Sequence, residues 1–199
     1  VASEMPKVRS DIIDFNGVLL ATSLPTASLY ANPRQILDSK EATQKLLRVF
    51  PNINRKKMAE KLSSSKSFVW LKRNLTPKTQ FLVNTLGIPG FDFQPTERRV
   101  YPHGRLVAHA LGLTNIDGRG LSGIEGYFDK VLRGTERPLE LSIDIRVQSV
   151  LREELVKAML EFRAIGAVGV IMDATNGEVQ AMISLPDFNP NKPITASGI

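Results

Sequence analysis

Two segments of the sequence have a spacing of residues that could carry chemistry. Ser63 and Lys66 match the Ser-x-x-Lys pattern, in which a nearby base activates a serine hydroxyl that is otherwise a poor nucleophile at neutral pH. Because three serines stand in a row there, the match arises easily by chance. Residues 118–123 match the spacing of a dinucleotide-binding fingerprint, and Glu140 lies near the distance of a ribose contact. Each motif therefore has to be judged by the elements around it.

The elements predicted around the glycine motif do not suit a nucleotide. The fingerprint requires a long buried strand before it and a sizeable helix after it, but residues 112–117 are short and polar, and the next helix is expected to end at Gly134. A structural loop, whose glycines permit positive φ angles and close backbone approach, is favoured. The alternative is a basic nucleotide- or nucleic-acid-binding protein that uses the Gly118 to Gly123 loop.

The sequence offers few groups for a metal or a cofactor. Cysteine is absent, which excludes disulfides, thiolate ligands and cysteine nucleophiles, and the only imidazoles are those of His103 and His109. We expect no metal site, no cofactor and no complete catalytic site. The formal net charge is +6, from 26 Lys and Arg against 20 Asp and Glu, and it favours an anionic neighbour. Each basic run taken alone is more typical of a solvated face.

Aromatic and basic side chains alternate around residues 66–73. Phe68 and Trp70 lie beside Lys72 and Arg73. This pattern suits a stacking surface for nucleic acid, or a strand with one core face and one solvent face, which is the commoner case. It also suits a docking surface for another protein, because aromatic and arginine side chains are enriched at the centres of interfaces. We therefore predict these four residues as a partner surface.

Caps, turns and hydrophobic periodicity predict a mixture of helices and strands. Two hairpins are expected around Asn-Gly turns, with strands at 12–13 and 18–21 and at 168–173 and 179–184. Helices are expected to begin after Asp38, Asn54, Thr76 and Asp144, with shorter helices at 105–111 and 127–132. The remaining segments are a glycine-rich loop at 117–126 and strands at 68–71, 91–101 and 139–143. The helix after Asp144 is the clearest, because apolar residues from Val147 to Phe162 share one face.

Residues 9–21 resemble the first N-terminal signature of class B penicillin-binding proteins, an Arg-Gly-x-Ile-x-Asp-Arg-Asn-Gly-x-x-Leu-Ala pattern. The polar and glycine positions that match are Arg9, Asp14, Asn16 and Gly17. The sequence departs from the pattern twice, with Ser10 in place of glycine and Phe15 in place of arginine.

Further stretches resemble later parts of the same family in the same order. The second signature is similar to residues 99–112, with Arg99, Tyr101, Pro102 and Gly104. The third is similar to residues 120–134, with Gly120, Gly123, Glu125, Asp129 and Gly134. Residues 141–148 and 177–191 resemble the first helix and the hairpin of the family's penicillin-binding domain. Each match alone is weak, and the specificity comes from five matches in order.

The resemblance implies an α+β fold with two parts. Residues 1–135 would form an elongated non-catalytic pedestal with an inserted head subdomain at about 30–93, and residues 136–199 would be the truncated beginning of a serine transpeptidase domain. Ser63 would then lie in the head, upstream of the domain that should hold the nucleophile. The chain itself is expected to be inactive, whereas the parent protein is expected to be a penicillin-sensitive serine DD-transpeptidase.

The division-specific branch of the family fits best, and it implies a scaffold in septal cell-wall synthesis on the periplasmic side of the bacterial inner membrane. No apolar stretch of membrane-spanning length occurs, so the parent's anchor is expected to be an upstream transmembrane helix. Expected partners are divisome membrane proteins, including a lipid-linked glycan polymerase. The parent's ligands would be peptidoglycan stem peptides and beta-lactams. Nucleic acid is not expected, and a homodimer through exposed hairpin edges is left open.

The charged residues within the signatures are Arg9, Asp14, Arg99, Glu125 and Asp129. We expect several of them to pair across segments that are far apart in sequence, in a structural role. A partly buried pair is weak evidence of net stability, but removing one partner leaves the other charge buried, at a cost of about 3 to 5 kcal/mol. The alternative is exposed pairs that are worth about 1 kcal/mol or less.

Overall fold

The computed structural model describes residues 9–192, which form two compact units. One unit consists of residues 25–98, and the other of the described residues before and after that segment. Two long strands, β2 (Leu19–Ala31) and β4 (Phe91–Val100), pass from one unit to the other and pair with each other. The chain therefore leaves and re-enters the larger unit through neighbouring strands.

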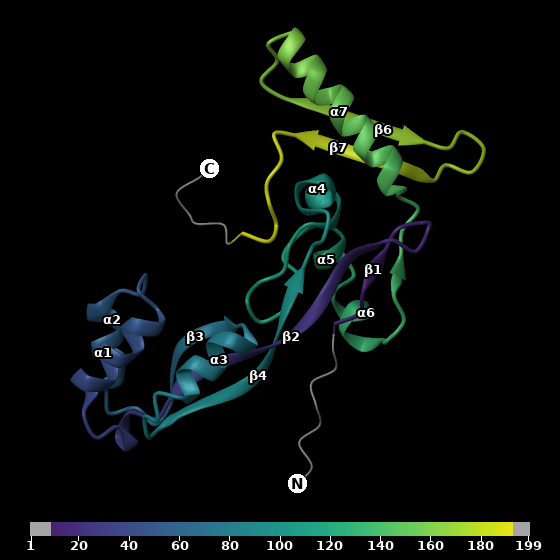
Figure 1. The fold of residues 1–199 in the computed structure, drawn as a ribbon. Helices are drawn as coiled ribbons and strands as arrows, with labels where there is room; N and C mark the ends of the chain where they lie inside the picture. Colours follow the sequence, from purple (N-terminus) through teal and green to yellow (C-terminus); the bar gives the residue numbers. More distant parts are fainter. Residues whose placement is uncertain (1–8, 193–199) are drawn as a thin grey trace. The chain divides into compact units, whose positions relative to one another are not determined.

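A small sheet and several helices form the unit of residues 25–98. Strand β3 (Val69–Leu75) runs antiparallel to the end of β2, with Tyr30 opposite Trp70, and β4 also pairs with β2. The helices are η1 (Pro33–Gln35), α1 (Ser39–Val49), α2 (Arg55–Leu62) and α3 (Pro77–Asn84). Helices α1 and α2 pack on each other, and α2 and α3 both contact β3 (Figure 1).

The three α-helices of this unit begin at the residues predicted as their N-caps. The side chain of Asp38 accepts a hydrogen bond from the amide two residues on, and those of Asn54 and Thr76 accept one from the amide three residues on. Each cap satisfies a backbone donor that has no partner within the helix. The starts of these helices were therefore readable from local sequence.

Apolar side chains from these elements form one core. Its most buried members are Leu29, Leu46, Leu62 and Val83. Val69 and Leu71 of β3 also point into it, so Trp70 and Lys72, which alternate with them, lie on the opposite face of the strand. This alternation is what places aromatic and basic side chains at the surface.

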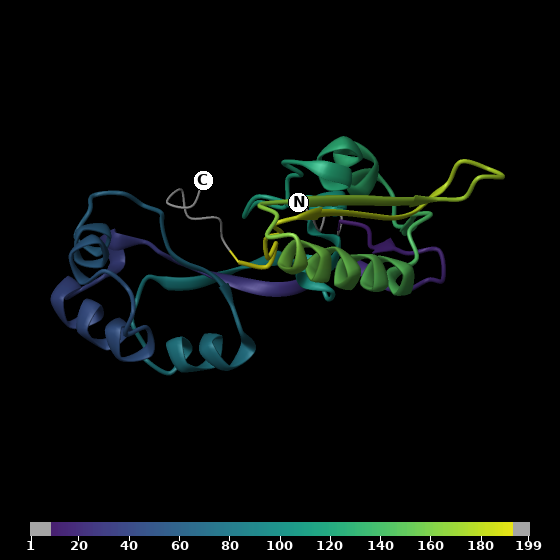
Figure 2. The ribbon, with the colours of Figure 1, turned by 90° about the horizontal axis from the view of Figure 1, so that it is seen from above.

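The larger unit contains two short strands and a series of short helices. Strand β1 (Ile12–Ile13) pairs antiparallel with the start of β2, with Ile12 opposite Ala21, and parallel with β5 (Leu139–Glu140). The helices are η2 (Gly104–Val107), α4 (Ala108–Leu111), α5 (Gly123–Tyr127), α6 (Asp129–Gly134) and α7 (Ile145–Glu161). Strands β6 (Ala167–Met172) and β7 (Val179–Leu185) form the second predicted hairpin, which lies alongside α7 (Figure 2).

Helix α7 packs on β6 but leaves large apolar side chains at the surface. Leu151 and Leu155 lie so close to Gly169 that a Cβ there would meet them at about 3 Å. In contrast, Phe162, which was predicted to share the buried face, is 74% exposed, and Ile165 is 99% exposed. Phe162 is the C-cap of α7 and Ile165 follows it, so both lie beyond the last residue of the helix. None of the helices within residues 9–192 has the length and hydropathy needed to cross a bilayer.

The mixed α+β class is confirmed, but several predicted boundaries are wrong, among them that of β3, which was predicted at 68–71 and spans Val69–Leu75. The strand predicted at 18–21 continues to Ala31, because its distal part pairs with β3 and β4, which local sequence does not encode. The strand predicted at 139–143 ends at Glu140, because Asp144 already caps α7. The loop predicted at 117–126 contains the first turn of α5.

Candidate functional site

A buried ion-pair network joins the three segments that contain the signature charges. One carboxylate oxygen of Glu125 lies 2.6 Å from Arg9 Nη2, and the other lies 2.7 Å from Arg99 Nε. Arg9 Nη1 also lies 2.7 Å from Asp129 Oδ1. Glu125 is fully buried, and the side chains of Arg9 and Arg99 are at most 4% exposed. Segments that are about a hundred residues apart in sequence therefore meet at one carboxylate.

The two arginines also fix backbone segments. Arg99 Nη1 donates to the carbonyl oxygen of Ser10 at 2.9 Å, and Arg9 donates to the carbonyl oxygens of Glu125 at 2.8 Å and Gly118 at 3.2 Å. Guanidinium groups suit this role because they offer five donors in a rigid plane. The network thus ties the start of the chain to both later signatures through side chains and backbone together.

The surroundings of this network shift the pKa values of two groups, Asp129 and Tyr101. Burial opposes ionisation of Asp129, but hydrogen bonds from the amide of Gly120 and from Arg9 outweigh it, so the pKa of Asp129 lies below its usual value. Burial, reinforced by the Glu125 carboxylate, raises the pKa of Tyr101 to about 12. At neutral pH the aspartate is charged and the phenol is neutral, as a structural cluster requires.

The glycine motif packs closely against other backbone segments of the protein. A Cβ at Gly120 would lie 1.9 Å from the carbonyl oxygen of Glu125, and a Cβ at Gly123, where φ is +58°, would lie 2.7 Å from that of Ala110. The amide of Gly120, which a phosphate would need, donates to Asp129 at 2.8 Å. Within the described chain the loop lies between the four-residue helix α4 and the five-residue helix α5, so the nucleotide alternative lacks the strand and helix it requires.

Asp14 links the first signature to α7. It is fully buried, and one carboxylate oxygen accepts hydrogen bonds from the amides of Asn16 and Val18, both at 2.8 Å. Its other oxygen accepts one from the amide of Ile145, the first residue of α7, at 3.1 Å. Gly17 completes the turn with φ of +79°. Asp14 therefore has a backbone-binding role and makes no contact with the arginine network.

Gln148 is a buried connector that the sequence analysis missed. Its amide nitrogen donates to the carbonyl oxygens of Leu106 at 3.0 Å and Met182 at 2.7 Å, and its amide oxygen accepts from the amide of Met182 at 2.8 Å. It thereby joins η2, α7 and β7. The available signal was a glutamine on the apolar face of α7, where an unpaired amide would be costly.

Asp187 and Asn191 attach the end of the described chain to the second signature. Asn191 exchanges two hydrogen bonds with the backbone of Tyr101, at 2.9 and 2.8 Å. Asp187 pairs with Arg105 at 2.8 Å and with Arg152 at 2.7 Å. Burial opposes ionisation of Asp187, but these two arginines outweigh it and lower its pKa. The sequence matched this segment to the family without assigning these contacts.

The remaining signature residues shape the backbone. Pro102 and Gly104 lead into η2, with Gly104 at a φ of +51°, and Gly134 is the last residue of α6. None of them takes part in the ion-pair network. Their predicted role as structural signature residues stays a prediction.

The Ser-x-x-Lys match is part of a helix end. Ser63 is the C-cap of α2, and its hydroxyl donates to the carbonyl oxygen of Ala59 at 2.9 Å. A hydroxyl that satisfies the end of its own helix in this way has the role typical of serine at a helix terminus. This geometry agrees with the rejection of Ser63 as a nucleophile.

The predicted partner residues Phe68, Trp70 and Arg73 lie together with a residue that the sequence analysis missed, Tyr30. The rings of Tyr30 and Phe68 stack with centroids 4.8 Å apart, and Phe68 meets Trp70 edge-on at 4.9 Å. Arg73 lies over the Trp70 ring at 4.6 Å. Lys72 is exposed on the same strand. We call these five residues the aromatic surface. Tyr30 joins it through cross-strand pairing, which no local motif indicates.

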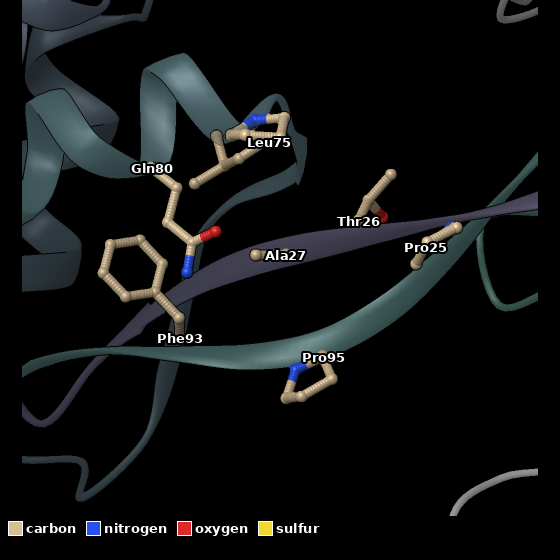
Figure 3. Close-up of a pocket in the computed structure, with 8 residues that line it drawn as sticks. Pro25, Thr26, Ala27, Leu75, Gln80, Phe93 and Pro95 are labelled. Carbon is tan, nitrogen blue, oxygen red and sulfur yellow. The ribbon is translucent and has the colours of Figure 1, made fainter.

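A groove of about 300 Å³ lies between α3 and strands β2 and β4 (Figure 3). Its walls are mostly apolar, and Gln80 and Thr26 are the polar side chains that line it. The lining residues are Pro25, Thr26, Ala27, Leu75, Pro77, Gln80, Phe93 and Pro95. The lining contains no charged, nucleophilic or metal-binding group, so the groove can hold an apolar group but offers no chemistry.

Comparison with known proteins identifies relatives of this chain. The family model described as penicillin-binding protein dimerisation domain matches residues 4–154. A probable peptidoglycan D,D-transpeptidase FtsI of Caulobacter vibrioides is 39% identical over 92% of this chain and 32% of its own length. The peptidoglycan D,D-transpeptidase FtsI of Escherichia coli K12 is 29% identical over 92% of this chain and 36% of its own length. The chain therefore spans about a third of these relatives.

Solved structures share the fold. The penicillin-binding protein PBP2 of Helicobacter pylori, in its complex with MreC, matches 94% of this chain and 43% of its own, with a TM-score of 0.70 and 22% identity. A peptidoglycan synthetase of Bifidobacterium adolescentis matches with a TM-score of 0.61 and 20% identity. The family match covers the buried network and the aromatic surface alike. The chain belongs to the penicillin-binding protein dimerisation domain family, in the class B penicillin-binding proteins.

Proposed function

We propose that this chain is the non-catalytic N-terminal scaffold of a peptidoglycan DD-transpeptidase that acts in septal cell-wall synthesis. Residues 1–135 form the pedestal, with the head at about 30–93, and residues 136–199 begin the transpeptidase domain. The scaffold positions the catalytic domain over peptidoglycan and binds partner proteins. The chain itself carries no acylation chemistry, and the catalytic serine belongs to another part of the parent protein.

The observation that carries this proposal is the buried network around Glu125. Its charges neutralise one another, and both arginines also donate to backbone carbonyls, although Arg99 Nη2 has no hydrogen-bond partner among the described residues. A reaction centre needs a group that is free to meet substrate, whereas a support needs distant segments held in fixed geometry. The network supports a mechanical role for the three signatures.

The exposed apolar residues of α7 and β6 support the assignment of residues 136–199. Val168 is 71% exposed, Val170 54% and Phe162 74%. A two-stranded sheet is marginal alone and gains stability when further strands or helices cover it. In the proposed parent, the rest of the transpeptidase domain packs on this face, while Gln148 and Asp187 hold its beginning to the pedestal.

The relatives support the cellular role. Two of them are named as peptidoglycan D,D-transpeptidases, and PBP2 of Helicobacter pylori forms a complex with MreC. By analogy, the parent of this chain acts on peptidoglycan stem peptides at the periplasmic side of the inner membrane, is inhibited by beta-lactams, and binds divisome proteins such as a lipid-linked glycan polymerase. A homodimer is the alternative assembly.

A fluorescent penicillin tests the proposal. The chain of residues 1–199 should not be labelled, whereas a longer form that includes the whole transpeptidase domain should be labelled at a serine beyond Asn191. A Ser63→Ala variant of the longer form should be labelled to the same extent as the wild type. Labelling of the short chain that disappears in Ser63→Ala would overturn the proposal, as would a longer form that folds and takes up no penicillin.

A further inference from the structure

The positive charge of the chain is concentrated in one compact unit. Residues 25–98 contain 13 Lys and Arg and five Asp and Glu, a formal net charge of +8. The rest of the chain contains 13 Lys and Arg and 15 Asp and Glu, a net charge of −2. A field of this sign attracts acidic partners and speeds their encounter with the protein. The excess charge thus indicates where an anionic partner would bind.

The aromatic surface lies in this basic unit and is already ordered. Tyr30, Phe68 and Trp70 fix one another by ring contacts, and the hydroxyl of Tyr30 donates to Asp92 at 2.9 Å. Lys61 donates to the carbonyl oxygen of Trp70 at 2.6 Å. Rigid aromatic side chains lose little conformational entropy on binding, which is why they serve as anchors of interfaces. Phe68 is nevertheless 41% exposed, so apolar area remains for a partner.

The arrangement of the rings distinguishes between classes of partner. Stacking of a nucleobase needs an open aromatic face, and the stacking of Tyr30 on Phe68 and the guanidinium of Arg73 over Trp70 already occupy one face of each ring. Insertion into a membrane would need protruding apolar side chains, but Trp70 is half-buried in the strand. A protein segment can contact ring edges and pair with the cations at the same time.

We propose that the aromatic surface binds an acidic segment of a partner protein, with Lys72 and Arg73 pairing with carboxylates and Phe68 and Trp70 contacting an apolar side chain between them. This inference rests on the proposed scaffold function, because it names the chemistry of one of its partners. Penicillin labelling of the longer form tests the scaffold function separately, so a failure of peptide binding can be distinguished from a failure of the scaffold function.

The chain contains a single tryptophan, so the fluorescence of Trp70 reports on this surface directly. Short random peptides displayed on phage would be selected against the chain of residues 1–199, and the enriched peptides synthesised. We expect them to be rich in Asp and Glu with an apolar residue between, and to change Trp70 fluorescence saturably. The double variant Lys72→Gln, Arg73→Gln should bind them at least about tenfold more weakly, while its melting temperature stays close to that of the wild type.

A matched control removes the same charge elsewhere in the unit. Lys40 and Lys78 are exposed and lie outside the aromatic surface, so the variant Lys40→Gln, Lys78→Gln should weaken binding less than about twofold. If both double variants weakened peptide binding equally, the effect would come from the overall charge of the unit, and the proposed binding site would be overturned. Enriched peptides without acidic residues would also overturn it. The proposal would also be overturned if an oligothymidylate or phosphatidylglycerol vesicles bound more tightly than the peptides and gave the same change in Trp70 fluorescence.

Discussion

Arg9 and Arg99 of the larger unit differ in role from Arg73 of the smaller one. Arg9 and Arg99 are almost completely buried in the larger unit, where Glu125 and Asp129 neutralise them. Arg73 lies at the surface of a unit with an excess of eight positive charges, over an aromatic ring. The difference lies in desolvation, because a fully buried charge must be neutralised locally whereas a charge near the surface is still partly solvated. Substitutions should therefore affect stability in the first unit and binding in the second.

The largest loss of stability should follow Glu125→Gln. This change leaves two buried guanidinium groups without their shared carboxylate and should lower the free energy of unfolding by about 3 to 5 kcal/mol. Urea unfolding followed by circular dichroism measures it. Glu153→Gln, at an exposed position on α7, removes the same charge and should change stability by less than about 0.5 kcal/mol. Equal values for the two variants would show that burial has no role.

A pair of glycine variants tests the close packing of the loop against the backbone of Glu125. Gly120→Ala would place a Cβ 1.9 Å from the carbonyl oxygen of Glu125, so the backbone must shift, and a loss of about 3 kcal/mol is expected. Gly134→Ala has open space around its Cβ and should leave stability within about 1 kcal/mol of the wild type. Thermal melts of both variants measure the contrast, which a fully tolerated Gly120→Ala would contradict.

Acid should weaken the larger unit through its paired aspartates. The folded-state pKa of Asp129 and that of Asp187 lie below the usual value, so these groups contribute stability above about pH 4 that is lost as the pH falls toward the folded pKa. The free energy of unfolding should therefore drop between about pH 6 and about pH 3. Asp129→Asn should be less stable at pH 6 but show a shallower drop. The same slope in both proteins would argue against the pairing.

The smallest effect on stability is expected at the aromatic surface. Lys72→Gln should leave the free energy of unfolding within about 0.5 kcal/mol of the wild type, and Arg73→Gln should cost at most about 1 kcal/mol, the value of an exposed cation–π contact. Urea unfolding followed by Trp70 fluorescence reports on this unit. If either variant lowered the free energy of unfolding as much as Glu125→Gln does, the predicted difference in stability effects between the two units would be wrong.

Much of the fold was predictable because the signals were local. Asp38, Asn54, Thr76 and Asp144 each cap the helix that was predicted to follow them. The extension of β2 to Ala31 was not predictable, because it depends on pairing with strands that lie much later in the chain. Phe162 was predicted on the apolar face of α7 but is its exposed C-cap, because periodicity shows neither where a helix ends nor what covers its face.

The candidate site was partly predictable. The sequence analysis expected several of the charges of Arg9, Asp14, Arg99, Glu125 and Asp129 to pair, since charged side chains are rarely buried unless paired, and all of them except Asp14 belong to the network. It could not assign Gln148, because a glutamine is equally compatible with a solvated position and its partners belong to η2 and β7. Tyr30 was missed for the same reason, since its neighbours are brought to it by strand register.

A double-mutant cycle on Arg99 and Glu125 tests the buried network most directly. Free energies of unfolding would be measured by urea titration for the wild type, Arg99→Met, Glu125→Gln and the double variant. If the two side chains pair as the structure shows, the loss in the double variant should differ from the sum of the single losses by about 1 to 3 kcal/mol. Losses that add within about 0.5 kcal/mol would contradict a network in which Glu125 holds the signatures together.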